Sequence, residues 1–305
     1  MGYFEVPEID YSRYTNRQLA AVPLALLAVA LLVLAGGWVV YGTPVQLGMD
    51  FSGGSELTVQ TSTPEGDIPA AFDEEPESIQ SIQTEDQYIV KFPAADDVDG
   101  EASGDGENRL TQLREQAASN LQPIEGSDEV VLSASSTSAS FGLETLRTAL
   151  LGLSAAFVGM SLLAFVLFRT FVPSIAIVVS AFSDVMIPLA FMNVVGIPLS
   201  LGTIAALLML IGYSVDSDIL LNNHILRRSG SFYESTYRAM QTGVTMTVTS
   251  MSAMFVMAIS AWAFGIDLLA SIGIILVVGL ATDLLNTYML NLSLLRWYKF
   301  EGVAR

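Results

Sequence analysis

The 305-residue chain contains no cysteine and a single histidine, His224. Disulfide bonds and thiolate metal sites are therefore excluded. The Asp, Glu and His residues form no cluster with the spacing of a metal site. No Ser/His pair or pair of catalytic acids stands at a reachable spacing. The sequence thus predicts no metal, no cofactor and no enzymatic chemistry.

Positive charge is also scarce. The chain carries 13 Lys and Arg residues against 31 Asp and Glu residues, which gives a net charge of −18. Only two residues are lysines, and the segment from Thr43 to Glu144 holds 21 of the acids and three bases. This balance argues against nucleic-acid binding. It indicates either an ordinary solvated acidic surface or, as we favour because lysine is so rare, a surface adapted to high salt, where counterions screen self-repulsion.

Apolar residues, by contrast, make up 52% of the chain. They gather in six runs, each long enough for a transmembrane helix, at residues 18–41, 146–168, 172–193, 199–223, 241–262 and 267–295. The first run exceeds the ~7–15 apolar residues of a cleaved signal peptide, so we expect a retained helix at 18–42. The chain is predicted to be an α-helical polytopic membrane protein, with helices 2–6 between residues 145 and 296. Most connections are short, and a longer polar one is expected from Arg227 to Met240.

The basic residues predict the orientation of these spans. If the N-terminus is inside, the cytoplasmic segments hold nine of the 13 bases, namely Arg13, Arg17, Arg169, Arg227, Arg228, Arg238, Arg296, Lys299 and Arg305. The two short outside loops hold none. Because charge in short loops sets orientation, we expect segments 1–17 and 297–305 in the cytoplasm and residues 43–144 outside it.

The polar segment 43–144 has the pattern of a small α+β domain. Strands are predicted at Ser55–Thr61, Ser78–Gln83, Gln87–Phe92 and Val130–Ser138, helices at Asp67–Phe72 and Arg109–Leu121, and a Gly- and acid-rich loop at residues 96–107. The order βαββαβ is typical of a ferredoxin-like sandwich. We find no catalytic constellation in this segment.

Four carboxylates stand inside predicted spans, namely Asp184, Asp216, Asp218 and Asp283. A carboxylate in hydrocarbon costs at least ~2.5–3.5 kcal/mol on insertion scales. No Lys or Arg stands in the middle of any span, and burial without a basic partner disfavours the charged form of a carboxyl group. A carboxyl group that gains and loses a proton inside the membrane is what a proton relay requires. The alternative is that these residues only hydrogen-bond neighbouring helices.

Positions on the helices refine this hypothesis. Asp216 and Asp218 are roughly 200° apart on a helix, so one is expected to face the bundle interior and the other a second interface. Asp218 shares its face with Asn222. His224 is expected at the surface of the cytoplasmic end. The fifth span, TGVTMTVTSMSAM, is rich in small and hydroxylated residues, which favours tight helix packing over hydroxyls that line a wet path.

Three motifs then point to a family. LGMDFSGGSEL, directly after the first span, resembles the G-[IM]-D-F-x-G-G signature of the SecD/SecF proteins at Gly48, Asp50, Phe51, Gly53 and Gly54. The two final glycines give the turn its backbone freedom, and Asp50 is expected to cap that turn. Ser183–Asp184–Val185 resembles the family's third-span motif. The stretch Ile211–Val215, with Gly212, Tyr213 and Ser214 and followed by acids, resembles its fourth-span motif.

The resemblance covers nearly the whole chain. One small domain after the first span and five further spans resemble the SecF members rather than the SecD members. This implies an accessory subunit of the Sec protein-export apparatus, an RND-type half that pairs with a SecD-like subunit in the membrane lipid. The implied partners are the Sec translocon channel and a translocating unfolded polypeptide. The implied energy source is the proton motive force or another ion gradient, with Asp184, Asp216, Asp218 and Asp283 as the proposed ion relay.

Two positions depart from the bacterial pattern. Ser217 stands where the family's fourth span usually has its functional Asp, and Thr245 stands where the fifth span usually has an Arg. A relay here would therefore need Asp283 or residues of the partner subunit. Together with the acidic composition, these variants resemble archaeal, halophilic members. Two alternatives stay open: a scaffold that only stabilises SecD and the channel, and half of an RND-type small-molecule exporter.

Overall fold

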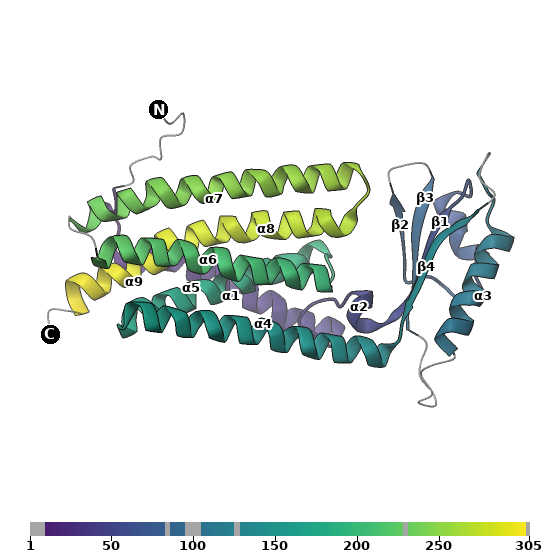
Figure 1. Cartoon of the computed structure of the whole chain (residues 1–305), viewed down its shortest axis with the longest axis horizontal. Helices are drawn as coiled ribbons and strands as arrows, with labels where there is room; N and C mark the ends of the chain where they lie inside the picture. The colour runs from purple at the N-terminus through teal and green to yellow at the C-terminus, as the bar shows by residue number, and fades with distance from the viewer. Residues whose placement is uncertain (1–9, 83–85, 95–104, 125–128, 228–230, 303–305) are drawn as a thin grey trace.

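The computed structural model describes residues 10–82, 86–94, 105–124, 129–227 and 231–302. The molecule is elongated, with a helical bundle at one end and a small α/β domain at the other (Figure 1). Six helices of the described chain are long and apolar enough to cross a membrane. They are α1 (Asn16–Tyr41), α4 (Ala139–Phe168), α5 (Phe171–Val195), α6 (Leu201–Arg227), α7 (Phe232–Ala263) and α8 (Asp267–Leu285).

The sixth span does not end with α8. It continues without a break through the π-helical turn η3 (Asn286–Asn291), the short helix α9 (Leu292–Trp297) and a second π-helical turn, η4 (Tyr298–Gly302). The first turn of η3 therefore follows directly on the apolar part of α8. This position matters below, because η3 carries three of the polar side chains at the centre of the bundle.

The expectation of a long polar connection from Arg227 to Met240 was wrong, because α7 begins at Phe232. Ser231 caps this helix by accepting a hydrogen bond from the backbone N–H of Glu234 at 3.2 Å. Glu234 also pairs with Arg238 one turn later, at 2.5 Å. An N-terminal cap and an i,i+4 ion pair both stabilise a helical turn whose residues are polar. The polar composition of this segment therefore did not indicate a loop.

The expected surface position of His224 was also wrong. Its side chain is buried, and Nδ1 lies 2.8 Å from the carbonyl oxygen of Leu220 on the same helix. The helical start of α7 explains the difference, because it helps to cover the end of α6 that lies far from the α/β domain. There Leu221 and Ile225 pack in one apolar cluster with Phe232 and with Tyr11 of the N-terminal segment. Burial raises the pKa of the Tyr11 phenol to about 12.

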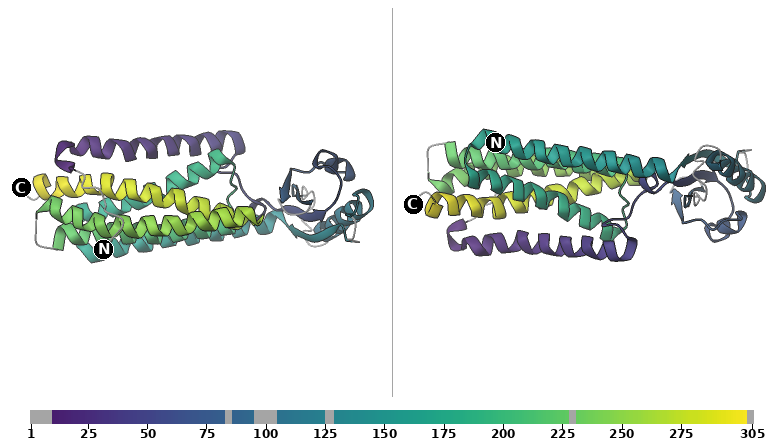
Figure 2. Two further views of the ribbon diagram at one scale, coloured as in Figure 1. Left: turned by 90° about the horizontal axis from the view of Figure 1, so that it is seen from above. Right: turned by 90° about the horizontal axis from the view of Figure 1, so that it is seen from below.

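The bundle has a central layer and a periphery. In their most apolar stretches, 56% of the residues of α5 and 50% of those of α6 are buried, against 6% in α4 and 17% in α7. Helix α1 lies along one flank of the bundle (Figure 2). The exposed side chains of α1 and α4 are predominantly large and apolar, and those of α7 are apolar mainly in its second half, at Phe255, Val256, Ile259 and Trp262. In a membrane protein such faces contact lipid or another subunit.

The α/β domain contains β1 (Gly54–Gln60), the 3₁₀ turn η2 (Glu65–Ala71), β2 (Ser78–Ile82), β3 (Gln87–Phe92), α3 (Asp105–Asn120) and β4 (Val131–Thr137). Its sheet is antiparallel with strand order β2-β3-β1-β4, the order of the predicted ferredoxin-like sandwich. The first expected helix is only a 3₁₀ turn. The expected loop at 96–107 lies mostly outside the described residues, and α3 begins at Asp105.

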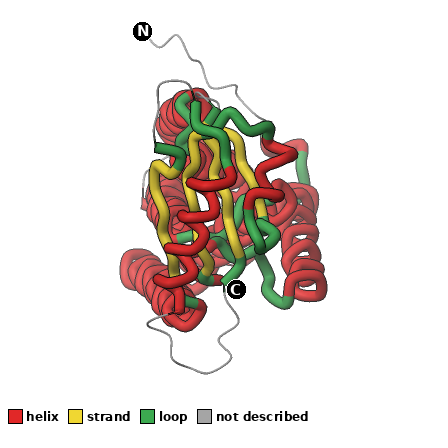
Figure 3. Tube along the Cα trace, turned by 90° about the vertical axis from the view of Figure 1, so that its right-hand side faces the viewer, coloured by secondary structure: helices red, strands yellow, loops and turns green. Residues whose placement is uncertain are grey.

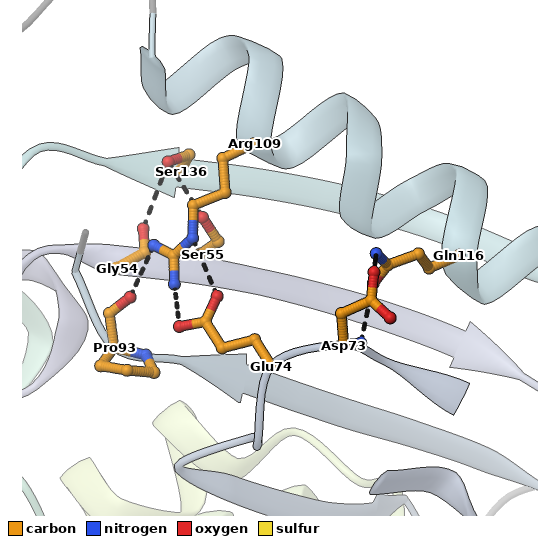
Figure 4. A network of polar contacts seen from close by, with 8 residues as sticks. All are labelled: Gly54, Ser55, Asp73, Glu74, Pro93, Arg109, Gln116 and Ser136. Atoms are coloured by element: carbon orange, nitrogen blue, oxygen red, sulfur yellow. Dashed lines mark hydrogen bonds and ion pairs between the residues drawn. The ribbon is translucent and has the colours of Figure 1, made fainter. Parts of the chain in front are cut away.

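Helix α3 lies on the face of the sheet that points away from the bundle (Figures 1 and 3). Leu57, Val90 and Phe92 of the strands pack there against Leu113 and Ala117 of the helix. The same layer is held by polar contacts (Figure 4). The guanidinium of Arg109 forms a bidentate ion pair with Glu74 and donates to the carbonyl of Pro93 at 2.8 Å. These contacts give Arg109 a structural role.

Candidate functional site

The central layer brings three carboxylates together. Helices α5, α6 and α8–η3 pack against one another, and each contributes one buried side chain: Asp184, Asp218 and Asp283 are 0–1% exposed. None of the ion pairs found among the described residues includes any of the three. Their neighbours are instead hydroxyl and amide groups, which can donate to a carboxylate without neutralising its charge.

Asp184 ties all three elements together. Its Oδ2 accepts a hydrogen bond of 2.5 Å from the hydroxyl of Ser214 on α6. Its Oδ1 accepts one of 2.5 Å from the amide of Asn286 on η3. Both oxygens therefore have donors from within the protein, an arrangement typical of a side chain that holds helices together.

Asp218 and Asp283 share one hydroxyl group. The Oγ1 of Thr287 lies 2.9 Å from Oδ1 of Asp218 and 3.2 Å from Oδ1 of Asp283. A hydroxyl has one proton, so Thr287 donates to one carboxylate at a time. The hydroxyl of Ser217 lies 2.7 Å from the same Oδ1 of Asp283 and 3.2 Å from Thr287. A short chain of hydroxyls thus joins two acids on different helices.

The π-helical turn η3 is what makes this arrangement possible. In an α-helix, residues five apart point roughly 140° away from each other. In a π-helix the backbone pairs residues five apart, which brings them near one face. Asn286 and Asn291 can therefore both face α5 and α6, where Asn286 reaches Asp184 and the amide of Asn291 donates to Asp218 at 2.7 Å.

A cavity of about 340 Å³ lies between α6, α7 and α8. Its wall includes Asp283 and Ser217, so the hydroxyl chain begins at this opening. Asp216, which is exposed on α6, lines the same cavity, as do Thr247 and Ser250 of α7. A cavity of this size with several polar groups is roomy enough for water. Asp283, although buried, therefore borders a space that can hold water.

The structure thus gathers Asp184, Asp218 and Asp283 in the central layer. Asp216 faces away from Asp218 on α6 and shares only the cavity wall with Asp283. Within the fourth-span motif, Ser214 contacts Asp184, Tyr213 is exposed and lines the cavity, and Gly212 borders open space. Thr245, at the position of the family's Arg, is exposed and its hydroxyl donates to Gln241 on its own helix at 2.6 Å.

Sequence reasoning missed Thr287 and Asn291, and it treated Ser217 only as a departure from the family pattern. The sequence offered only a weak signal for them, namely that Thr287 and Asn291 are polar residues in the mostly apolar segment that follows Asp283. Their common direction depends on the π-helical turn, which the spacing does not reveal.

The signature glycines lie where the α/β domain joins the bundle. The backbone N–H of Gly48 donates to the carbonyl of Leu199 at 2.7 Å. Asp50 accepts a hydrogen bond of 2.9 Å from the backbone N–H of Leu201, the first residue of α6. It thus caps the helix that carries Asp218. The expectation that Asp50 caps the turn of its own motif was wrong, because the short helix α2 (Met49–Ser52) in that turn has no side-chain cap and the carboxylate reaches α6 instead.

Gly53 and Gly54 complete this junction. Both have positive φ angles, of 75° and 131°. A Cβ on Gly53 would stand 2.7 Å from the backbone nitrogen of Ala139, at the start of α4. Phe51, between the motif's Asp and its glycines, is completely buried and packs in the main cluster of the bundle. The motif therefore fixes the segment that follows α1 against the first residues of α4 and α6.

Comparisons with known proteins agree along the whole chain. Residues 116–301 match the family model described as protein export membrane protein SecD/SecF, C-terminal, and residues 38–65 match the SecD/SecF GG motif. The chain is 60% identical over 305 residues to the protein-export membrane protein SecF of Haloferax volcanii, and 58% identical over 306 residues to that of Haloquadratum walsbyi, with full coverage of both chains in each case. SecF of Pyrococcus furiosus is 35% identical over 94% of this chain and 93% of its own.

Among solved structures, the fold is similar to that of SecDF from Thermus thermophilus, a translocon-associated membrane protein. The TM-score is 0.70 at 22% identity, over 96% of this chain and 39% of the longer SecDF chain. A super-membrane-facing form of SecDF gives a TM-score of 0.58 at 20% identity, over 100% of this chain and 40% of that one.

Proposed function

The chain belongs to the SecF proteins of the SecD/SecF protein-export family, and on that basis we propose that it is a membrane-embedded accessory subunit that promotes polypeptide export. The full-length match to SecF of Haloferax volcanii supports this function. In this proposal the chain performs no covalent chemistry. It works with the Sec translocon channel and assists an unfolded polypeptide as that polypeptide leaves the membrane.

The energy for this work would come from an ion gradient. The observation that carries this part is the pair Asp218 and Asp283, joined by the single hydroxyl of Thr287 and open to the cavity at Asp283. An ion or proton that enters the cavity reaches Asp283 first and Asp218 next. One charge moved through 100 mV releases about 2.3 kcal/mol, enough to shift a helix between two packed arrangements.

The proposed output of this site is movement of the α/β domain. A change of charge at Asp218 alters which groups α6 can hold against α5 and η3. The outer end of α6 is hydrogen-bonded to Asp50 and, through Leu199, to Gly48. A shift of α6 would therefore pull on the junction below the sheet, and the domain would move with the polypeptide that it holds.

A SecD-like subunit is the proposed partner. Asp216 is exposed in the middle of a spanning helix, where lipid would disfavour its charge, so we place a polar surface of the partner against it. The mostly exposed apolar faces of α4 and α7 offer further area for contact with the partner or with lipid. The solved SecDF chain, of which this chain spans 39%, is long enough to contain a second half of similar size. Asp216 would then join the relay from the partner side.

The proposed orientation places segments 1–17 and 297–305 in the cytoplasm, residues 18–42 and 145–296 in the membrane, and 43–144 outside. The start of α1 and the end of η4 lie at the same end of the bundle, opposite the α/β domain (Figure 1). Because the chain has no cysteine, single cysteines can test this. We expect a membrane-impermeant maleimide to label Ser62→Cys on intact cells and to label Ser231→Cys only after lysis. Labelling of Ser231→Cys on intact cells would reverse the orientation.

Asparagine substitutions test the proposed relay. We expect secretion of a reporter protein to fall strongly with Asp283→Asn and Asp218→Asn, because Asn keeps the shape of the side chain but carries no ionisable group. The amounts of this chain and of its partner, measured by blotting, should stay unchanged. Asp216→Asn should show an intermediate loss. Asp67→Asn, an exposed position of the α/β domain, is the matched control and should secrete normally.

The scaffold alternative has one observation in its favour, the complete set of donors around Asp184. Asp184→Asn is therefore expected to be the mildest of the buried substitutions. If Asp218→Asn and Asp283→Asn also secrete at the level of the control, the gradient-coupled function is wrong, and the three carboxylates serve only to join helices.

A further inference from the structure

A second cavity, of about 820 Å³, lies at the end of the bundle far from the α/β domain. It is lined by the start of α1, the start of α7 and the end of the sixth span, α9 and η4, which all lie at that end (Figures 1 and 2). Its volume is within the range of ~300–1,000 Å³ that is usual for ligand pockets. The wall includes Arg17, Tyr233, Arg296, Trp297, Phe300 and Glu301.

Arg296 is held in this wall by three contacts. Its Nη1 donates to the carbonyl oxygens of Tyr11 at 3.1 Å and Tyr14 at 2.7 Å. Its guanidinium carbon lies 5.8 Å from the ring centre of Tyr233. A guanidinium carries five N–H groups, so these two carbonyls leave the three on Nε and Nη2 for another acceptor. Arg296 is therefore a fixed fork of donors, the geometry that suits a phosphate.

Arg17 adds a second positive charge to the same wall. It follows Tyr14 by three residues, so the bond from Arg296 to Tyr14 brings that guanidinium close to the segment that carries Arg17. Arg17 is exposed, and none of the ion pairs found among the described residues includes Arg17 or Arg296. The wall also holds one acid, the exposed Glu301. The cavity thus has a net positive charge in a chain whose net charge is −18.

Aromatic side chains place the cavity at the surface of the membrane. Tyr233, Trp297 and Phe300 are 36%, 44% and 55% exposed. They stand where the spans α7 and α8–η4 begin or end. Trp and Tyr are enriched in membrane proteins at the level of the lipid headgroups. An anion in this cavity would therefore be at the depth of a lipid phosphate.

The outer face of α1 continues this site toward the middle of the bundle. Leu24 and Leu31 come roughly two and four turns after Arg17, on the same face of the helix. Both are exposed, by 44% and 43%. An apolar face that runs on from a basic cavity matches a molecule with an anionic head and hydrocarbon chains. A soluble anion would make no use of it.

We propose that this cavity binds the headgroup of one anionic phospholipid. The phosphate accepts hydrogen bonds from Arg17 and from Nε and Nη2 of Arg296, and the acyl chains lie along Leu24 and Leu31. Basic pockets between spanning helices are suited to anionic headgroups for this reason. The bound lipid would join the start of α1 to the end of the sixth span. The proposal is independent of the function proposed above.

The chain has three tryptophans, and their positions allow a direct test. Trp38 and Trp262 lie near the opposite ends of α1 and α7, so replacing both by phenylalanine leaves Trp297 as the only tryptophan. The full chain is placed in phosphatidylcholine nanodiscs that contain increasing fractions of brominated phosphatidylglycerol or, in a parallel series, brominated phosphatidylcholine. Bromine quenches tryptophan fluorescence on contact. We expect half-maximal quenching at a fraction of phosphatidylglycerol roughly tenfold lower than that of phosphatidylcholine, because hydrogen bonds between charged groups are the strong ones.

The measurement is made at about 1 M salt, where the Debye length is about 3 Å. General attraction of the lipid to surface charge is then screened, and direct contacts dominate. Arg17→Gln is expected to lower the preference for phosphatidylglycerol roughly fivefold, the effect of one basic residue at an anionic membrane surface. Arg13→Gln is the matched control, because Arg13 is 80% exposed at the same end of the bundle, is paired with Asp10 and is not part of the cavity wall. It should keep the original preference.

Three results would overturn the proposal. The first is equal quenching by the two brominated lipids. The second is an equal loss of preference in Arg17→Gln and Arg13→Gln, which would mean that surface charge in general attracts the lipid. The third comes from adding an excess of soluble glycerol phosphate, which should leave the quenching by phosphatidylglycerol unchanged. If it abolishes that quenching, the occupant of the cavity is a soluble anion.

Discussion

Replacing Thr287 by valine is expected to reduce secretion of a reporter protein roughly tenfold or more, while the chain stays folded in the membrane. Valine has nearly the shape of threonine and the same β-branch, so the packing of η3 is kept. The hydroxyl that donates to either Asp218 or Asp283 disappears, so one of the two carboxylates loses a donor and the link between them is lost. A hydrogen bond to a charged group contributes about 1.5–3 kcal/mol, which corresponds to roughly a ten- to hundredfold change in an equilibrium.

Two further variants separate the hydroxyl from the fold. Thr287→Ser retains the hydroxyl and should secrete close to the wild-type level. Thr282→Val is the matched control, because Thr282 is buried five residues earlier on α8 and donates only to the carbonyl of Val278 on its own helix, at 2.9 Å. The measurement is the secreted fraction of the reporter, with chain amounts checked by blotting. Equal secretion by Thr287→Val and Thr282→Val would show that the two acids do not communicate through this group.

The second large effect is expected at Gly53, where alanine should destabilise the chain by about 2–6 kcal/mol, from two separate causes. Gly53 has φ of 75° and ψ of 180°, a backbone region that is essentially restricted to glycine, and an L-residue there costs about 1–3 kcal/mol. A Cβ would also stand 2.7 Å from the nitrogen of Ala139, and forcing atoms into a packed junction costs typically 1–3 kcal/mol.

Three other glycines isolate these causes. Gly196 also has a positive φ, of 80°, but it lies in the αL region with open space around it, so Gly196→Ala should show the cost of a positive φ without a steric clash. Gly142 has no positive φ, but its Cβ would lie 2.6 Å from the carbonyl of Phe51, so Gly142→Ala should show the steric effect alone. Gly66 has neither, and Gly66→Ala should be neutral. Unfolding of the solubilised chain in increasing SDS measures the order. A Gly53→Ala chain as stable as Gly66→Ala would mean that the junction is not packed as described.

Hydropathy and charge predicted the class of this fold because they indicate which residues contact water and which contact lipid or the protein core. A run of more than 18 apolar residues is typical of a transmembrane helix, and the alternation of polar and apolar residues in a strand indicates which face of the sheet is buried. The same rules misplaced the start of α7, because a cap and an ion pair can hold a polar turn in a helix. They also misplaced His224, whose burial depends on segments distant in the sequence.

The candidate site was harder to predict from the sequence, because it too depends on contacts between segments distant in the sequence. The helical angle alone separated Asp216 from Asp218, and the structure places one on the exposed face and the other inside. Which acids on different helices meet is a matter of tertiary packing. The positions of Thr287 and Asn291 depend in addition on one π-helical turn, and the spacing of the polar residues gives no sign of it.

The hydrogen bond between Asp50 and the start of α6 can form only late in synthesis of the chain. The two residues are 151 positions apart, and chains are made at about 5–20 residues per second. The carboxylate thus leaves the ribosome roughly 8–30 s before the helix that it caps. The α/β domain, whose apolar core is formed by its own residues, can fold within this interval. Closing the junction is then a late step in the assembly of the protein, and a chain interrupted before residue 201 would carry a folded domain on an unfinished bundle.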